Sequence, residues 1–154
     1  MKSSRAIRSI GTLAVCALAL AATRVAAQSV ALPLKIQGNA TVTVNLVDGS
    51  WLWEDHGLAN FIGRFTNEGS GIEFHQPGDA GTGAVTAANG DQIFWLSHLT
   101  DVELTGGTGR FANVNGGFSF EETVQSISFP SPGILVVTLT YIGAGTMNFG
   151  VGPR

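Results

Sequence analysis

Glycine clusters punctuate this chain and constrain its fold more than any other feature. The sequence contains 21 glycines in 154 residues, about twice the usual share. A unit of Gly-Thr-Gly, a short segment and Asn-Gly occurs at residues 81–90 and again at residues 107–116, offset throughout by 26 positions. Because glycine permits the backbone angles of tight reversals, we expect hairpin turns at these clusters, and above all at residues 106–109.

Between the clusters, apolar and polar residues alternate with period two, which is typical of strands with one face in a core. In residues 118–124 this alternation places Phe118, Phe120 and Glu122 on the inward face. Residues 51–60 are less regular and are expected to form a loop or a single turn. The other predicted strands are residues 40–47, 58–67, 71–75, 82–87, 92–98, 101–105, 134–142 and 146–150.

About eight or nine short strands separated by turn signals predict an all-β sandwich or barrel. An antiparallel β-barrel of about eight strands is the favoured architecture because the chain has few devices that protect sheet edges. Lys35 is the only lysine after residue 27, and closing a sheet removes the edges that lysines would otherwise guard. No segment after residue 27 shows the period of an amphipathic helix.

The first 27 residues have the pattern of a removable export signal. Lys2, Arg5 and Arg8 precede an apolar run at residues 10–22 that is short for a membrane span, and small residues follow up to Ala27. We expect cleavage after Ala27 and a secreted or periplasmic protein. Removing 27 of the 154 residues leaves 127, a single domain (28–154) large enough for a core.

The cysteine content and net charge of the chain after residue 27 limit which kinds of partner are expected. The only cysteine, Cys16, lies in the predicted signal, so no disulfide is expected in the mature chain. Four basic residues remain against eleven acidic ones, which gives a net charge of −7. This charge argues against nucleic acid and anionic membrane surfaces as partners. No apolar run after the signal predicts an integral membrane segment, and an oligomer is possible.

Three motifs in order resemble a known family: Gly-Arg-Phe-Thr at residues 63–66, Thr-Ala-Ala-Asn-Gly-Asp at 86–91 and Thr-Gly-Gly-Thr-Gly-Arg-Phe at 105–111. Together they resemble exported bacterial proteins with an allene oxide cyclase-like barrel, and the Gly-Gly-Thr-Gly turn is similar to one in plant dirigent proteins. The resemblance implies an eight-stranded antiparallel barrel with an apolar lumen. Plant members cyclise an allene oxide or steer radical coupling without a protein-bound cofactor. No position here matches their active-site motifs, so no catalytic residue is carried over.

Aromatic residues are the candidate contacts for a ligand in such a lumen. Aromatic side chains at a barrel mouth commonly hold apolar or ring-shaped molecules. The residues expected to do so are Trp51, Trp53, Phe94, Trp95 and Tyr141. Two alternatives stay open: these aromatics pack an ordinary core, or the barrel is filled by its own side chains and serves a structural role.

A second functional class is a cofactor-free cyclase or isomerase, for which Glu122, His98 and Tyr141 are the candidate proton-handling groups. Glu122 is predicted to point inward, where a carboxylate needs a partner such as Arg64 or Arg110. His98 shares a strand face with Phe94 and is expected at a barrel mouth.

No metal or cofactor is expected. The three histidines, His56, His75 and His98, fall in different segments, and no two of them have the spacing of metal ligands. The glycine turn at residues 106–109 lacks the Lys-Ser/Thr and the following helix of a phosphate-binding loop. The expected partner is therefore a hydrophobic small molecule.

Overall fold

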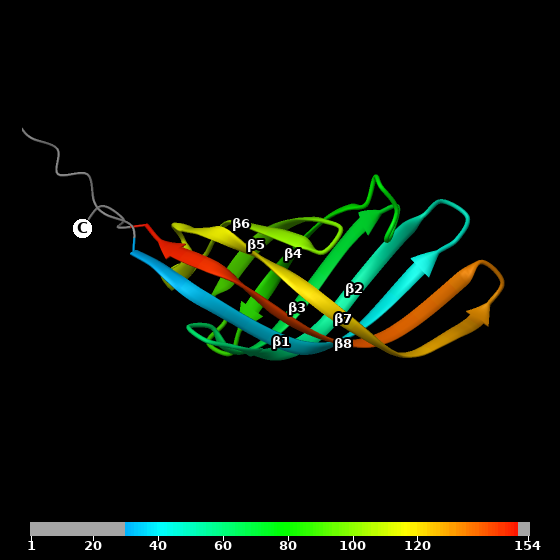
Figure 1. The fold of residues 1–154 in the computed structure, drawn as a ribbon, viewed down its shortest axis with the longest axis horizontal. Coiled ribbons are helices and arrows are strands. Elements are labelled where there is room, and N and C mark those ends of the chain that lie inside the picture. Colours follow the sequence, from blue (N-terminus) through cyan, green and yellow to red (C-terminus); the bar gives the residue numbers. More distant parts are fainter. Residues whose placement is uncertain (1–29, 151–154) are drawn as a thin grey trace, which may run out of the picture.

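The computed structural model describes residues 30–150, which form one closed antiparallel β-barrel of eight strands (Figure 1). Each strand pairs with its neighbours in sequence, and β8 pairs with β1 to close the sheet. The all-β, eight-stranded prediction is confirmed. The strands are β1 (Val30–Asn45), β2 (Ser50–Ala59), β3 (Gly63–Ile72), β4 (Ala80–Ala87), β5 (Gln92–His98), β6 (Asp101–Gly107), β7 (Val114–Ser131) and β8 (Ile134–Phe149).

The predicted export signal, residues 1–27, lies outside the described residues. Within residues 30–150, no helix has the length and apolarity needed to cross a membrane. The one helical element in that range is a single 3-10 turn, η1 (Gly109–Phe111).

The strands differ greatly in length, and this difference shapes one end of the barrel. β7 has 18 residues and β1 and β8 have 16 each, whereas β4 has 8 and β5 and β6 have 7. β6 pairs with β7 only between Asp101–Leu104 and Gly116–Ser119. Beyond Phe120, β7 has no strand on that side in the described part of the chain. β7, β8 and β1 therefore continue past the shorter strands as a projecting curved sheet (Figure 1).

The expectation of turns at the glycine clusters 69–71, 81–83, 116–117 and 143–145 is wrong, because all of them lie inside strands. Gly69 of β3 pairs with Gly83 of β4, and Gly71 pairs with Gly81. A methyl group at any of the four would overlap an indole ring, that of Trp95 for the first pair and that of Trp51 for the second. The glycines therefore make room inside a small barrel for large aromatic rings, the small-with-large alternation that such interiors require.

The reversal expected at residues 106–109 is confirmed. Gly106 and Gly109 have φ values of +139° and +52°, in the region that favours glycine. They turn the chain from β6 through η1 into β7, and Phe111 of η1 is fully buried. The neighbouring Arg110 donates a hydrogen bond from Nη2 to the Ile62 carbonyl at 2.9 Å, which fixes η1 to the β2–β3 connection.

Several strand boundaries differ from the predictions. Residues 134–142 and 146–150, predicted as two strands, merge into the single strand β8 (Ile134–Phe149), and β1 and β7 extend well beyond the predicted ranges 40–47 and 118–124. Residues 51–60, expected as a loop or a turn, form most of β2, with Trp51, Trp53 and Asp55 buried in alternation. The predicted strand 58–67 contains the turn between β2 and β3. β3 then ends at Ile72, since Glu73 and His75 take positive φ values (+57° and +53°) and residues 73–79 form the β3–β4 connection.

Candidate functional site

The barrel lumen is lined mainly by aromatic side chains. Trp51, Trp53, Trp95 and Tyr141 are all buried, and all four line the interior cavity, as the aromatic pattern predicted. The ring of Trp53 packs against Phe120 and Tyr141, with centroids 5.9 Å away in each case. These edge-on and tilted contacts hold the rings in fixed orientations around the cavity.

The cavity is small because side chains fill most of the lumen. Its volume is about 50 Å³, a few times the roughly 10–15 Å³ that one water molecule requires. Pockets for drug-sized ligands measure about 300–1,000 Å³. The lumen therefore has space for a narrow group of a few heavy atoms, and a larger molecule must extend outside it.

One carboxylate, Asp55, lies among these rings. Its side chain is 7 % exposed. The Oδ2 atom accepts hydrogen bonds from the Trp53 indole N–H at 2.5 Å and from the Asn67 amide at 2.8 Å. The Oδ1 atom is buried and has no hydrogen-bond partner among the described residues. Asn67 is itself oriented by the Trp95 indole, which donates to its Oδ1 at 2.8 Å.

Burial dominates the electrostatics of this cluster. It raises the pKa of Asp55, and the hydrogen bonds from Trp53 and Asn67, together with the nearby Tyr141 hydroxyl, offset only part of that effect. Burial, together with the charge of Asp55, also raises the pKa of Tyr141 above its usual range. Tyr141 is therefore a neutral phenol at physiological pH, and its hydroxyl lies close enough to Asp55 to act on the pKa of that carboxyl, but it makes no hydrogen bond of normal geometry to Oδ1. The lumen thus contains one unsatisfied acceptor in apolar surroundings.

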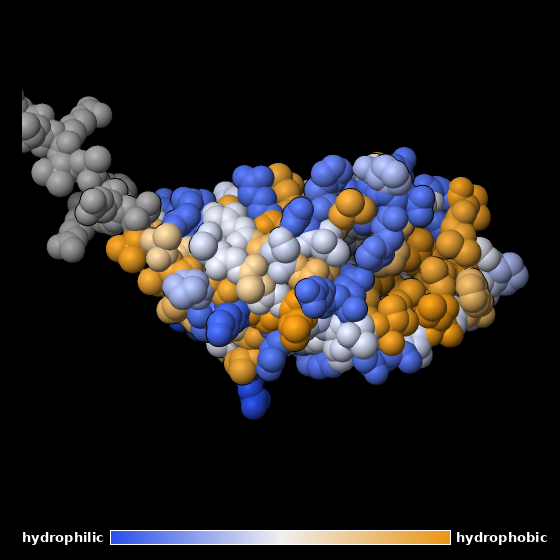
Figure 2. All heavy atoms as spheres, viewed as in Figure 1, coloured by the Kyte–Doolittle hydropathy of each residue, from blue (hydrophilic) through white to orange (hydrophobic). Residues whose placement is uncertain are grey.

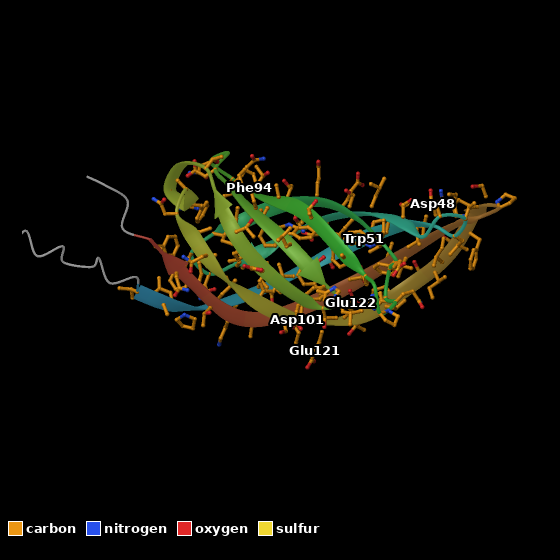
Figure 3. The ribbon with its side chains drawn as sticks, turned by 90° about the horizontal axis from the view of Figure 1, so that it is seen from above. Asp48, Trp51, Phe94, Asp101, Glu121 and Glu122 are labelled. Atoms are coloured by element: carbon orange, nitrogen blue, oxygen red, sulfur yellow. The ribbon has the colours of Figure 1, made fainter. Side chains whose placement is uncertain are left out.

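A second polar pair lies where the β3–β4 connection meets β7. The Nε2 atom of His75 is 3.0 Å from Oε2 of Glu122. Burial raises the pKa of Glu122, and the His75 partner counteracts that effect. Glu122 lies on the inner side of β7 and Glu121 points outward, as the alternation predicted (Figure 3). We call this pair the clasp, because it joins β7 to the β3–β4 connection in the region where β7 is no longer paired with β6.

Asp79 fixes the loop that carries His75. Its Oδ2 accepts the His75 backbone N–H at 2.8 Å, and its Oδ1 accepts the Trp51 indole N–H at 3.2 Å. The carboxylate is 4 % exposed, so burial without these two donors would be costly. The position of the clasp is thereby tied to an aromatic ring of the lumen.

Beyond the clasp, the inner face of β7 continues as exposed apolar surface. Val124 pairs with Leu139, and Ile127 pairs with Val137. Cross-strand partners share a face, and both β8 residues are buried in the core, so Val124 and Ile127 face inward. Phe129 continues this face by alternation. These three residues, 51 %, 59 % and 66 % exposed, form what we call the apolar shelf.

The shelf leads toward the lumen. Along the inner face of β7, Glu122 and Phe120 follow Val124, and both line the cavity. Figure 2 shows hydrophobic side chains gathered over the projecting end of the β7–β8 hairpin. The projecting sheet thus presents an apolar surface that runs from solvent to the aromatic interior.

Two predicted site residues lie outside the lumen. Phe94 is on the outer face of β5 and is 41 % exposed (Figure 3). Its neighbours Ile93 and Trp95 are buried and point inward. His98 shares the outer face with Phe94 and donates a hydrogen bond from Nδ1 to the Asp79 backbone carbonyl. The expectations that Phe94 contacts a luminal ligand and that His98 faces the mouth are therefore corrected. The four central residues of β5, at positions 93–96, are all apolar. The alternation of residues therefore could not identify which face of β5 points inward.

The predicted partners of Glu122 are also corrected. Neither Arg64 nor Arg110 contacts it; Arg110 lies near Asp91 and η1, and His75 takes the position beside Glu122. Among residues 30–150, no group of three metal-ligating side chains comes together.

The polar residues of the site that sequence reasoning missed are Asp55, Asn67 and Asp79. One signal was present for Asp55: it follows Trp51 and Trp53 at a spacing of two, which places all three on one face if the segment is a strand. For Asn67 and Asp79 the sequence carries no comparable signal, because their roles depend on contacts with Trp95 and Trp51 from other strands.

Comparisons with known proteins give no relative: no protein-family model, no curated protein and no solved structure matches this chain.

Proposed function

We propose that this barrel binds a narrow apolar molecule, with one end in the aromatic lumen and the rest on the apolar shelf. The supporting observation is the row of apolar side chains that runs from Phe129 and Ile127 on the projecting sheet to Trp53 and Tyr141 inside, interrupted on β7 by Glu122. Exposed apolar surface of this kind costs free energy in water, and its retention beside a cavity marks a binding surface.

The cavity volume sets the shape of the ligand. About 50 Å³ accepts the end of a slender chain, a single ring enters only if the lining side chains shift slightly, and the shelf supplies further contact area outside. Alkyl chains and alkyl-substituted single rings fit these two conditions. A fused multi-ring compound would require the lumen aromatics to move.

The test is calorimetric titration of the purified protein with 1-octanol and with 4-propylphenol. We expect saturable binding with a negative heat-capacity change, the signature of apolar burial. The variant Ser97→Leu places a larger side chain in the cavity, which Ser97 lines, and is expected to weaken binding at least tenfold. Ser70→Leu, on the outer face of β3, is the matched control and should bind like the wild type.

Absence of saturable binding for both ligands would leave the barrel as a filled, structural one and reject the proposal. Equal binding by wild type and Ser97→Leu would place the ligand elsewhere on the molecule.

A second candidate function, a cofactor-free cyclase or isomerase, is favoured by the ionisable groups beside the cavity. Glu122 has a raised pKa, which brings a carboxyl closer to the range useful for proton transfer at neutral pH. Tyr141 stays neutral and can donate a hydrogen bond to a developing oxyanion. The resemblance to allene oxide cyclase-like proteins suggests an unsaturated epoxide as substrate class.

This candidate is tested by incubating the protein with unsaturated fatty epoxides and analysing the products on a chiral column. A cyclase gives one enantiomer in excess, and Glu122→Gln reduces that excess while Glu121→Gln does not. A racemic product at the uncatalysed rate rejects the enzymatic role and leaves binding as the function.

Export remains part of the proposal. The N-terminal pattern predicts cleavage after Ala27, so Edman sequencing of protein from the periplasm or medium should begin at Gln28. Protein found only inside the cell with Met1 intact would reject it.

A further inference from the structure

We infer that Asp55 anchors the inner end of the ligand, and that this end carries a hydrogen-bond donor such as a hydroxyl group. The inference rests on the proposed function and specifies the ligand class: an apolar molecule with a terminal hydroxyl rather than a pure hydrocarbon, an ether or a ketone. The carrying observation is the buried Oδ1 atom, which lacks a hydrogen-bond partner in the described structure and belongs to a residue that lines the cavity.

The two oxygens of Asp55 have different surroundings. Oδ2 is fully engaged by Trp53 and Asn67, at 2.5 Å and 2.8 Å. These two donors fix the orientation of the carboxylate, and Trp95 in turn fixes Asn67 at 2.8 Å. Oδ1 is consequently held in place as a bare acceptor, although its residue is only 7 % exposed.

Such an arrangement is costly in a protein that needs only a stable core. A buried acceptor without a donor loses its hydrogen bonds to water and gains no hydrogen bond within the protein. Proteins tolerate unsatisfied buried groups where a ligand or a bound water supplies the missing partner. At Asp55, three side chains from β2, β3 and β5 hold the free acceptor beside an apolar cavity, and a ligand hydroxyl meets that requirement.

The surrounding rings add selectivity. Around Oδ1 the cavity is lined mostly by aromatic and aliphatic side chains, including Trp53, Phe120 and Tyr141. A polar ligand group placed against these rings would lose hydration without finding a partner. The site therefore selects molecules with one donor at the end and apolar atoms behind it.

The experiment compares two ligands that differ only at the donor: 4-propylphenol, and 4-propylanisole in which a methyl group replaces the phenolic hydrogen. Binding is measured by calorimetry at pH 8. We expect the wild type to bind the phenol at least roughly tenfold more tightly, the size expected of a hydrogen bond to a charged acceptor. Glu121→Gln, on the outer face of β7, is the control and should keep this preference.

The variant Asp55→Asn changes only the identity of the free atom. Trp53 and Asn67 still require an acceptor, so the amide oxygen takes the place of Oδ2 and the amide NH2 takes the place of Oδ1. The free group is then a donor, from which the phenol oxygen and the ether oxygen can both accept a hydrogen bond. The preference for the phenol should therefore fall to within about twofold. Circular dichroism and the melting temperature verify that this variant folds.

The outcomes separate the two claims. If neither ligand binds the wild type, the proposed luminal function fails and the inference fails with it. If both bind the wild type equally, the lumen binds apolar molecules but Oδ1 is satisfied by a buried water, and the inference alone is overturned. This second outcome is read from the wild type and does not depend on the folding of any variant.

Discussion

His75 and Glu122 face each other across the gap that β6 leaves beside β7, with Nε2 and Oε2 3.0 Å apart. Beyond the last β6–β7 pairings and the hydrogen bond from the Phe120 N–H to the Thr100 carbonyl, this contact joins β7 to the short-strand side of the barrel. His75 is 42 % exposed in its side chain and Glu122 is 13 % exposed. The clasp therefore lies at the boundary between solvent and lumen, where a ligand on the shelf must pass.

Opening the clasp should accelerate ligand exchange. In Glu122→Gln the charged partner of His75 is lost while the size of the side chain is kept. We expect association and dissociation of 4-propylphenol both to speed up, with stability changed by no more than about 1 kcal/mol, because removal of a half-buried charge offsets the weakened contact. Stopped-flow tryptophan fluorescence measures the rates. Unchanged rates in Glu122→Gln would mean that the ligand enters by another route.

A side chain added at one of the glycines that face Trp51 or Trp95 should displace the indole ring. Gly83→Ala introduces a methyl group that overlaps the Trp95 ring, and we expect a loss of about 1–3 kcal/mol, as for other overpacked cores. Chemical denaturation measures the loss, and the Trp95 fluorescence should shift with it. Thr82→Ala, at the exposed position beside it in β4, is the control and should change stability by less than about 0.5 kcal/mol. A stabilised Gly83→Ala would contradict the role of these glycines.

Asp55 should make the protein less stable as the pH rises. Burial raises the pKa of Asp55 in the folded state, so the folded protein binds this proton more tightly than the unfolded chain does. The stabilisation is complete below the unfolded pKa, near pH 4, and is lost as the pH rises through the folded value. Glu122, whose pKa is also raised by burial, contributes in the same direction.

The measurement is the melting temperature of wild type and Asp55→Asn between pH 3.5 and pH 8. We expect the melting temperature of Asp55→Asn, relative to that of the wild type, to increase with pH above about pH 4, because Asn cannot ionise. A difference between the two proteins that is independent of pH would show that the folded environment does not perturb Asp55.

The shelf should increase the affinity of long ligands selectively. Along the series 1-butanol, 1-hexanol, 1-octanol, each buried methylene contributes up to about 0.8 kcal/mol. Phe129→Ser removes apolar area from the shelf and should reduce the gain for the longest members without affecting 1-butanol. Phe94→Ser removes a phenylalanine from the outer face of β5 and is the matched control. Equal effects of the two substitutions would exclude the shelf from the binding site.

The barrel was predictable because its strands follow the alternation of residues. In residues 118–124, Phe118 and Phe120 alternate with Ser119 and Glu121, and the structure places them accordingly. The inward position of Glu122 was predicted from the same pattern. Its partner was not, since His75 comes from a loop whose path depends on Asp79 and the ring of Trp51.

The site itself was harder to predict, for reasons visible in β2 and β5. In β2 the run Glu54-Asp55-His56 is polar on both faces, so the carboxylate that points inward conceals the strand pattern. In β5, Phe94 and Trp95 are apolar neighbours on opposite faces. Only the slot formed by Gly69 and Gly83 determines that Trp95 points inward. Functional positions often break the local pattern in this way.

Nuclear magnetic resonance of the three indole N–H groups tests the luminal site most directly, because all three tryptophans line the cavity. On titration with 4-propylphenol, we predict saturable shifts of the Trp51, Trp53 and Trp95 indole signals, with smaller changes at the outer-face residue Phe94. If the three indole signals stay fixed while the ligand is in excess, or if shifts appear only around Phe94, the luminal site is contradicted.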